Sequence, residues 1–177
     1  MATNSDAEAF CRELLSYVDS EDIFYFPGPE NIPYEYTKWQ PEWKRDRILT
    51  INRIFSNRKA MIVTSVAGIL RKIPEKKSLT GKSIILKQGN DYSLEKLALD
   101  LVRLGYQREE VCEQFGHFSL KGGILDIYTP YLSYPVRMDF FGDTLDELRT
   151  FDPNTQKSIQ KIEEIIITAA NELVFSK

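Results

Sequence analysis

Residues 117–151, HFSLKGGILDIYTPYLSYPVRMDFFGDTLDELRTF, carry the pattern that decides the fold. Glycine and proline divide this stretch into short runs of aliphatic, aromatic and β-branched residues: 118–121, 124–128 and 136–141. Runs of this length between turn residues predict β-strands. Gly142 and Asp143 give a turn signal before the next apolar run, so the sequence predicts an antiparallel hairpin here.

A helix is predicted just before this sheet. Ser93 has the side chain of an N-cap, and Gly105 is placed to end the helix. The expected buried stripe follows helical spacing and comprises Leu94, Leu97, Ala98, Leu101 and Val102. Residues 83–87 predict a strand before the helix, and residues 165–168 form the last β-like run.

The first 74 residues predict alternating helices and strands. Ser5 and Glu8 have the spacing of a capping box for a helix at 6–18, whose inward face would include Phe10, Leu14, Leu15 and Val18. Strands are expected at 22–26 and 60–64. A second helix, with Ile48, Ile51 and Phe55 on one face, would lie between them and end near Asn57. This order favours α/β layering with parallel strands, because parallel neighbours need a crossover.

Length and composition limit the classes of protein to which this chain can belong. The chain has 177 residues, a formal net charge of −3 and 42% hydrophobic residues, which is typical of one globular domain or a compact pair. No apolar run approaches the length of a membrane span. Cys11 and Cys112 cannot make a disulfide framework, so a reducing cytoplasm is the expected location. The negative charge disfavours an indiscriminate phosphate binder.

Catalytic motifs are incomplete. Gly81, Lys82 and Ser83 mimic the end of a phosphate-binding loop, but position 76 is lysine where that motif needs glycine, and a strand follows where it needs a helix. His117 is the only histidine, which excludes a two-histidine metal site. We therefore expect neither a metal, nor a cofactor, nor a complete enzyme in these residues, and favour an interaction module.

Candidate binding residues follow the predicted helix. Arg108 comes just after the helix end, and Phe118 and Lys121 lie on the next predicted strand. Strand alternation places Ser119 and Lys121 on one face. These side chains suit a protein interface. Alternatively, Arg108 only caps the helix and Lys121 is an ordinary exposed residue.

A nucleic-acid site is a second possibility. The proline-rich segment with Pro29, Pro33, Pro41, Tyr34 and Tyr36 predicts an extended loop. Within and after it, aromatic residues could stack on bases and arginines could contact phosphates: Trp39, Trp43, Arg45, Arg47 and Arg53. We favour the alternative that the aromatics anchor the loop beside a solvated helix face, because the net charge is negative.

The order of several motifs resembles a known family. LVRLGYQREEV (101–111) and FGHFSLKGGILDIY (115–128) resemble the UvrA-interaction domain shared by the transcription-repair coupling factor family and the excinuclease subunit UvrB. Other segments are similar to the coupling factors: FPGPENIPYE (26–35), IVTSVAGILRKIP (62–74) and YPVRMDFFGDTLDELRTFDPNTQKSI (134–159). The resemblance covers nearly the whole chain.

The resemblance implies a domain organisation that agrees with a polar break at 74–78. Residues 1–74 would be part of a degenerate RecA-like α/β domain, and 75–153 an inserted mixed α/β UvrA-interaction domain. Residues 154–177 would return to the RecA-like domain. The family implies a helicase-like, ATP-driven DNA translocase that removes stalled RNA polymerase and recruits UvrA for nucleotide excision repair. Its ATP, magnesium, double-stranded DNA and RNA polymerase sites would lie in other domains. A fragment of UvrB stays an alternative.

The resemblance also assigns site residues. Arg108 and Lys121 occupy positions where the family engages UvrA through basic residues, although the second is usually arginine. Ser119 falls where UvrB has another arginine. Phe118 and Tyr128 are further candidate contacts or, equally, core residues. The expected mechanism is recruitment through charge-assisted contacts to carboxylates on UvrA.

Overall fold

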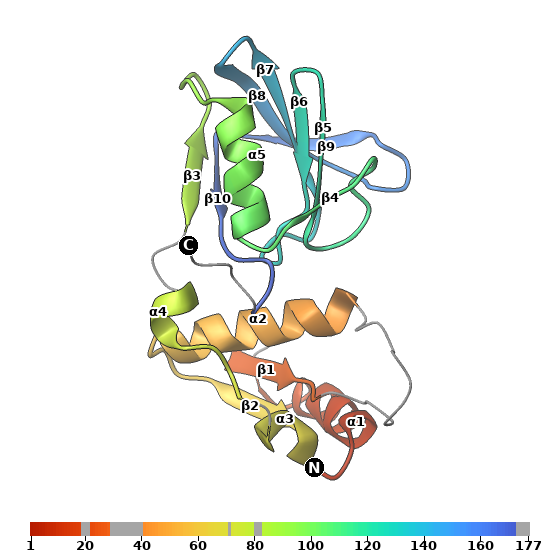
Figure 1. The fold of residues 1–177 in the computed structure, drawn as a ribbon. Helices are drawn as coiled ribbons and strands as arrows, with labels where there is room; N and C mark the ends of the chain where they lie inside the picture. Colours follow the sequence, from red (N-terminus) through yellow and green to blue (C-terminus); the bar gives the residue numbers. More distant parts are fainter. Residues whose placement is uncertain (19–21, 29–40, 71, 80–82, 173–177) are drawn as a thin grey trace. The chain divides into compact units, whose positions relative to one another are not determined.

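The computed structural model describes residues 1–18, 22–28, 41–70, 72–79 and 83–172. The chain divides into two compact units, Met1–Lys76 and Lys77–Lys177 (Figure 1). A four-residue helix, α4 (Lys76–Leu79), spans the division. Both units mix helices with strands, so the mixed α/β class predicted from the sequence is confirmed.

The first unit contains two paired strands and three helices. Its elements are α1 (Asn4–Leu14), β1 (Ile23–Phe26), α2 (Pro41–Phe55), β2 (Met61–Thr64) and α3 (Val66–Leu70). β1 and β2 pair in parallel, with Ile23 opposite Met61 and Phe26 opposite Thr64. The predicted parallel strands are thus confirmed, and α2 lies in the connection between them.

Helices α1 and α2 cover opposite faces of the β1–β2 pair. Ile23 and Val63 pack with the apolar side of α1. Phe24 and Phe26 alternate with Ile23 along β1 and therefore face the other way. There they meet α2, whose Arg47 guanidinium lies 4.0 Å from the centroid of the Phe26 ring.

The predicted first helix is correct in type but differs in detail. Its capping box uses Thr3 and Asp6 rather than Ser5 and Glu8: the Asp6 amide donates to the Thr3 hydroxyl at 3.1 Å, and the Thr3 amide to the Asp6 carboxylate at 3.2 Å. The helix ends at Leu14. Ala7, Cys11 and Leu14 form its inward stripe, so the prediction that Phe10 and Leu15 point inward was wrong.

The second helix begins earlier than expected. Pro41 starts α2, which suits the first turn of a helix, so Trp43 is helical rather than part of the loop. Arg47 is fully buried and donates from Nη1 to the Pro27 carbonyl at 2.7 Å, so it does not lie on the solvated helix face that the sequence suggested. The loop residues predicted between 29 and 40, Trp39 among them, lie outside the described residues, as do Gly81 and Lys82.

A buried polar contact holds three segments of the first unit together. Asn4 donates from Nδ2 to the Gly28 carbonyl at 2.7 Å and accepts from the Gly28 amide at 3.0 Å. The Ser65 hydroxyl donates to the same Asn4 oxygen at 2.7 Å. Glycine is needed at position 28 because a Cβ there would lie 2.4 Å from the Gly68 nitrogen.

The second unit is built on a six-stranded sheet in which strand order follows chain order. Its strands are β4 (Gln107–Arg108), β5 (His117–Lys121), β6 (Ile124–Ile127), β7 (Val136–Phe141), β8 (Thr144–Phe151) and β9 (Ser158–Ile162). β4 and β5 pair in parallel, and all other neighbours are antiparallel. The predicted strands and the β7–β8 hairpin are confirmed, whereas β4 and β9 were not predicted.

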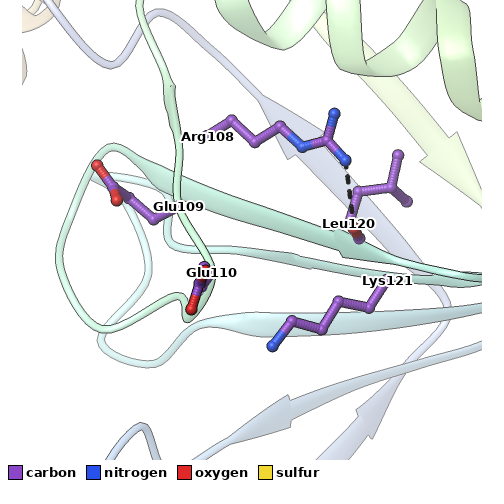
Figure 2. Close-up of a pocket in the computed structure, with 5 residues that line it drawn as sticks. All are labelled: Arg108, Glu109, Glu110, Leu120 and Lys121. Carbon is purple, nitrogen blue, oxygen red and sulfur yellow. Dashed lines mark hydrogen bonds between the residues drawn. The ribbon is translucent and has the colours of Figure 1, made fainter.

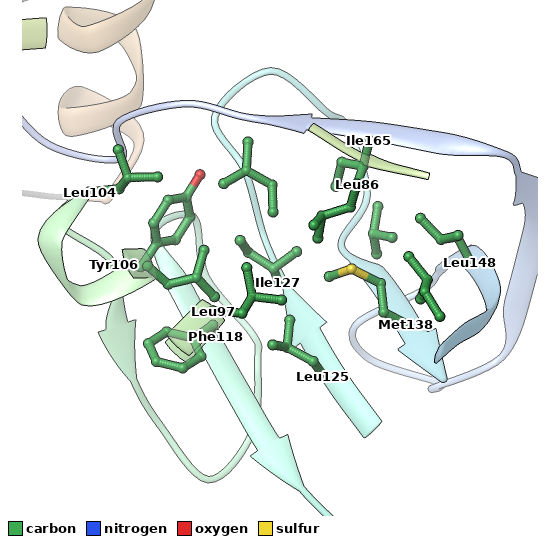
Figure 3. Close-up of a cluster of buried hydrophobic side chains, with 14 of the residues drawn as sticks. Leu86, Leu97, Leu104, Tyr106, Phe118, Leu125, Ile127, Met138, Leu148 and Ile165 are labelled. Atoms are coloured by element: carbon green, nitrogen blue, oxygen red, sulfur yellow. The ribbon is translucent and has the colours of Figure 1, made fainter. Parts of the chain in front are cut away.

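Helix α5 (Leu94–Arg103) lies on one face of this sheet (Figure 1) and forms the main core with it, whose buried side chains are drawn in Figure 3. Ser93 caps the helix as predicted, and Gly105 follows it with φ 88°. Leu97 and Leu101 are buried, but Val102 is exposed, contrary to prediction. The strands β3 (Ile84–Lys87) and β10 (Glu164–Ile167) pair antiparallel and add Leu86, Ile165 and Ile167 to the core.

The C-terminal part of the chain differs from the expected organisation. Residues 154–177 were expected to return to the first domain, but β9 pairs with β8 and β10 pairs with β3. Both pairings lie within the second unit, which extends to the end of the chain. The described part of this segment therefore belongs to the second unit, because its apolar residues complete that unit's core.

Candidate protein-binding site

Parallel pairing of β4 with β5 brings the two predicted basic residues together. Arg108 lies opposite Phe118, and Lys121 is the last residue of β5. Together with Glu109, Glu110 and Leu120 they line an open depression of about 310 Å³ (Figure 2). The predicted pair is thus one surface feature, although the two residues are separated in the sequence.

Neither cation is neutralised by a neighbouring side chain. Arg108 donates from Nη2 to the Leu120 carbonyl at 3.4 Å, which is long for a hydrogen bond. Within the described ranges, neither Arg108 nor Lys121 forms an ion pair. Both side chains are exposed. They can therefore contact an anionic group on a partner without first breaking an internal salt bridge.

Two carboxylates share the depression. Adjacent acids such as Glu109 and Glu110 usually form part of an ordinary solvated face. The amide of Glu109 donates to the Phe118 carbonyl at 2.9 Å, which fixes the backbone just beyond β4. The depression therefore carries two positive and two negative side chains. The four charged side chains come together because β4 pairs with β5, and the sequence pattern did not predict β4.

The other predicted contacts are buried. Phe118 belongs to the main core, and Tyr128 is also buried. The Tyr128 hydroxyl donates to the Ser133 carbonyl at 2.8 Å, and its ring lies 4.2 Å from that of Phe115. These contacts give both residues a structural role. Their assignment as direct partner contacts stays a prediction, and their burial argues against it.

Ser119 lies on the face of Lys121, as predicted, but is only 5% exposed. It is opposite Asp126 on β6, and Asp126 is opposite Arg137 on β7. Arg137 binds the Asp126 carboxylate through two hydrogen bonds, which raise the pKa of Arg137. A small hydroxyl fits beside this pair, so Ser119 offers little surface to a partner.

The arginines proposed for nucleic-acid binding already have partners within the first unit. Arg47 is buried against Pro27 and Phe26. Arg53 forms a 2.9 Å ion pair with Asp22 and also donates to the Lys59 carbonyl at 3.1 Å. An arginine that contacts DNA phosphates needs a free, solvent-facing guanidinium. This geometry disfavours the nucleic-acid alternative.

The described part of the chain offers no group of three or more histidine, cysteine or acidic side chains arranged to hold a metal ion. The Cys112 thiol donates to the His117 carbonyl at 3.3 Å, and burial raises its pKa, so it is a structural rather than a nucleophilic group. Among the same residues, no helix has the length and apolar character needed to span a bilayer.

Comparisons with known proteins identify the family of the chain. A family model described as the UvrB interaction domain matches residues 84–173, more than half of the chain. A transcription-repair-coupling factor from Staphylococcus haemolyticus is 31% identical over 170 residues, which cover 96% of this chain and 14% of that protein. A transcription-repair-coupling factor from Staphylococcus aureus is 29% identical over 171 residues, which cover 97% of this chain and 15% of that protein. The chain belongs to the UvrB interaction domain family.

Proposed function

We propose that the second unit recruits UvrA through the depression lined by Arg108 and Lys121. The observation that carries this proposal is that two exposed cations line one depression and, among the described residues, form no ion pair. Charge-assisted hydrogen bonds to carboxylates of the partner would be stronger than neutral ones. The Lys121 ammonium would act as a compact charge, whereas the planar Arg108 guanidinium could donate two parallel hydrogen bonds to one carboxylate.

The wider activity is a proposal about the longer proteins that this chain resembles. The chain spans about a seventh of the length of the two relatives named transcription-repair-coupling factor. Such a protein would be an ATP-driven DNA translocase that displaces stalled RNA polymerase and couples transcription to nucleotide excision repair. ATP, magnesium, DNA and RNA polymerase would be bound by its other domains, and these residues would contribute protein binding rather than catalysis.

The first unit would be part of a degenerate RecA-like domain. The parallel β1–β2 pair with helices on both faces supports this assignment, because such layering is typical of doubly wound α/β folds. A UvrB fragment is the remaining alternative. The two coupling-factor relatives, each matched over nearly the whole chain, favour the coupling factor over it.

Titration calorimetry of the chain against purified UvrA tests the proposal. The wild type is expected to bind, and Arg108→Glu with Lys121→Glu is expected to abolish or strongly weaken binding while the protein stays folded. Lys96→Glu with Lys157→Glu is the matched control, since it changes the net charge equally at two exposed sites away from the depression. Equal affinity of the site variant and the control would refute the assignment.

A further inference from the structure

The two-stranded sheet formed by β3 and β10 has a partly apolar outer face (Figure 1). Ile85 and Ile166 lie directly opposite each other on it, and they are 51% and 53% exposed. Lys87 and Glu164 form the neighbouring pair on the same face, and their exposed side chains make a 3.0 Å ion pair. These four residues are called the ribbon face below.

The opposite face of the same two strands belongs to the main core. Leu86 and Ile165 are register partners there, are 0% and 4% exposed, and are labelled next to each other in Figure 3. Since successive residues of a strand face opposite ways, Ile85 and Ile166 are turned away from the core. Packing of the second unit therefore does not require isoleucine at these two positions.

The hydrogen-bond pattern of the ladder brings the two isoleucine side chains together. Opposed residues of an antiparallel pair alternate between hydrogen-bonded and non-hydrogen-bonded positions, and side chains lie closer at the second kind. The Gln88 amide donates to the Glu163 carbonyl at 3.0 Å, whereas the Lys87 amide points away from β10 and donates to the Tyr92 hydroxyl at 2.9 Å. By this alternation the two isoleucines form a non-hydrogen-bonded pair, so their side chains make one continuous apolar spot.

The charges of the ribbon face are complementary to a second copy of the same face. A two-fold axis that runs along the strands, between two stacked copies, places β3 of one copy over β10 of the other. Lys87 then meets Glu164 of the second copy, and Ile85 meets Ile166 of the second copy. A two-fold axis across the strands would instead separate the charged residues of the two copies. One rotation thus satisfies both the apolar and the charged pairs.

We propose that the ribbon face joins two copies of this chain in a weak, symmetric dimer. Removal of the isoleucine side chains from water supplies the attraction, and the charged residues that border them fix the orientation. A stable interface takes about 20–30 residues from each partner, so this smaller face gives a dimer that exchanges with the monomer. The ribbon face shares no residue with the depression, and the inference therefore does not rest on the proposed function.

Sedimentation velocity of the whole chain, from micromolar to millimolar concentration, tests the inference. The wild type is expected to shift from monomer toward dimer as its concentration rises. Ile166→Thr replaces an ethyl group with a hydroxyl but keeps the β-branched shape, so it should raise the dissociation constant of the dimer about tenfold or more without unfolding the chain. Ile159→Thr is the matched control, because Ile159 is 49% exposed on β9, outside the ribbon face, and should associate like the wild type.

Charge reversals test the orientation of the two copies. Lys87→Glu makes both charged residues of the ribbon face acidic, and Glu164→Lys makes both basic, so each variant alone should be monomeric because like charges meet. An equimolar mixture of the two variants should form a heterodimer, since the acidic face then meets the basic one. Lys87→Glu combined with Glu164→Lys only exchanges the charges and should dimerise like the wild type.

Three results would overturn the inference. A wild type that stays monomeric at millimolar concentration forms no such dimer. A dimer that Ile166→Thr weakens no more than Ile159→Thr uses another surface. A mixture of the two charge variants that forms no heterodimer contradicts the axis along the strands. Arg108→Glu with Lys121→Glu should dimerise like the wild type, so failure of this inference can be distinguished from failure of the UvrA assignment.

Discussion

Arg137 and Asp126 face each other on β7 and β6, and the guanidinium donates to the carboxylate twice, from Nε to Oδ1 at 2.8 Å and from Nη2 to Oδ2 at 2.7 Å. The two side chains are 21% and 10% exposed. Arg137 also lies over the ring of Phe151, at 4.5 Å from its centroid. This pair fixes the sheet face next to Ser119.

Arg137→Ala is expected to destabilise the second unit by about 2–4 kcal/mol, because it leaves a nearly buried carboxylate without its partner. Urea unfolding followed by far-UV circular dichroism measures the loss. Arg103→Ala is the control, since Arg103 pairs with Asp100 on the exposed side of α5 at a similar 2.8 Å. It should cost less than about 1 kcal/mol. Equal losses would contradict the importance of burial here.

Neutralising the acids of the depression tests the charge of the partner. Glu109→Gln with Glu110→Gln is expected to tighten UvrA binding severalfold at low salt, because the site then attracts carboxylates more strongly. The gain should disappear at high salt. Surface plasmon resonance would show it mainly in the association rate. Weaker binding would mean that Glu109 or Glu110 itself contacts a cation on UvrA.

Gly28→Ala is expected to destabilise the first unit by about 2–4 kcal/mol. The new methyl group would lie 2.4 Å from the Gly68 nitrogen and 2.6 Å from the Ala67 carbonyl carbon, so backbone must move. Both tryptophans belong to residues 1–76, and their fluorescence reports this unit. Gly142→Ala, with φ 63° and an unobstructed Cβ position, should cost about 1 kcal/mol and leave that fluorescence transition unchanged.

The partly buried Asp46 carboxyl predicts that the stability of the first unit depends on pH. The pKa of Asp46 is raised from 3.8 to about 6, chiefly by burial; Arg45 opposes this rise, and Glu8 and Glu42 add to it. The native state therefore binds this proton more tightly than the unfolded state, and stability falls as pH rises from about 4 to about 6. Asp46→Asn should stabilise the unit at pH 7.

The measurement is urea unfolding of wild type and Asp46→Asn by tryptophan fluorescence at pH 4 and pH 7. The advantage of the asparagine variant should be present at the higher pH and small at the lower one. An advantage that grows toward acid pH would mean that the sign of the Asp46 effect is opposite.

The elements predicted correctly are those whose ends or turns are marked by residues within or next to the element itself. Helix α5 has its cap at Ser93 and its stop at Gly105, and the β7–β8 hairpin has Gly142 at its turn. β4 was missed because two polar residues, Gln107 and Arg108, carry no strand pattern. Their strand exists only because β5 lies alongside.

The candidate site residues stay a prediction, and the structure adds surroundings that the sequence did not reveal. Arg108 and Lys121 became candidates through their positions after the helix and on the next strand, the resemblance added to this, and both line one depression. The burial of Ser119 depends on a pair from two later strands, which no pattern around residue 119 reveals. Arg47 shows the same limit, since its charge predicts exposure while Phe26 and the Pro27 carbonyl bury it.

The antiparallel pairing of β3 with β10 would allow this part of the chain to be inserted into another protein. Ile84 lies opposite Ile167, so the segment that holds the six-stranded sheet and helix α5 begins and ends at adjacent points. A host protein could receive residues 84–167 in a surface loop with almost no separation to bridge, and little closure entropy would be lost. Residues 84–167 inserted into an unrelated protein would bring with them the depression proposed to bind UvrA.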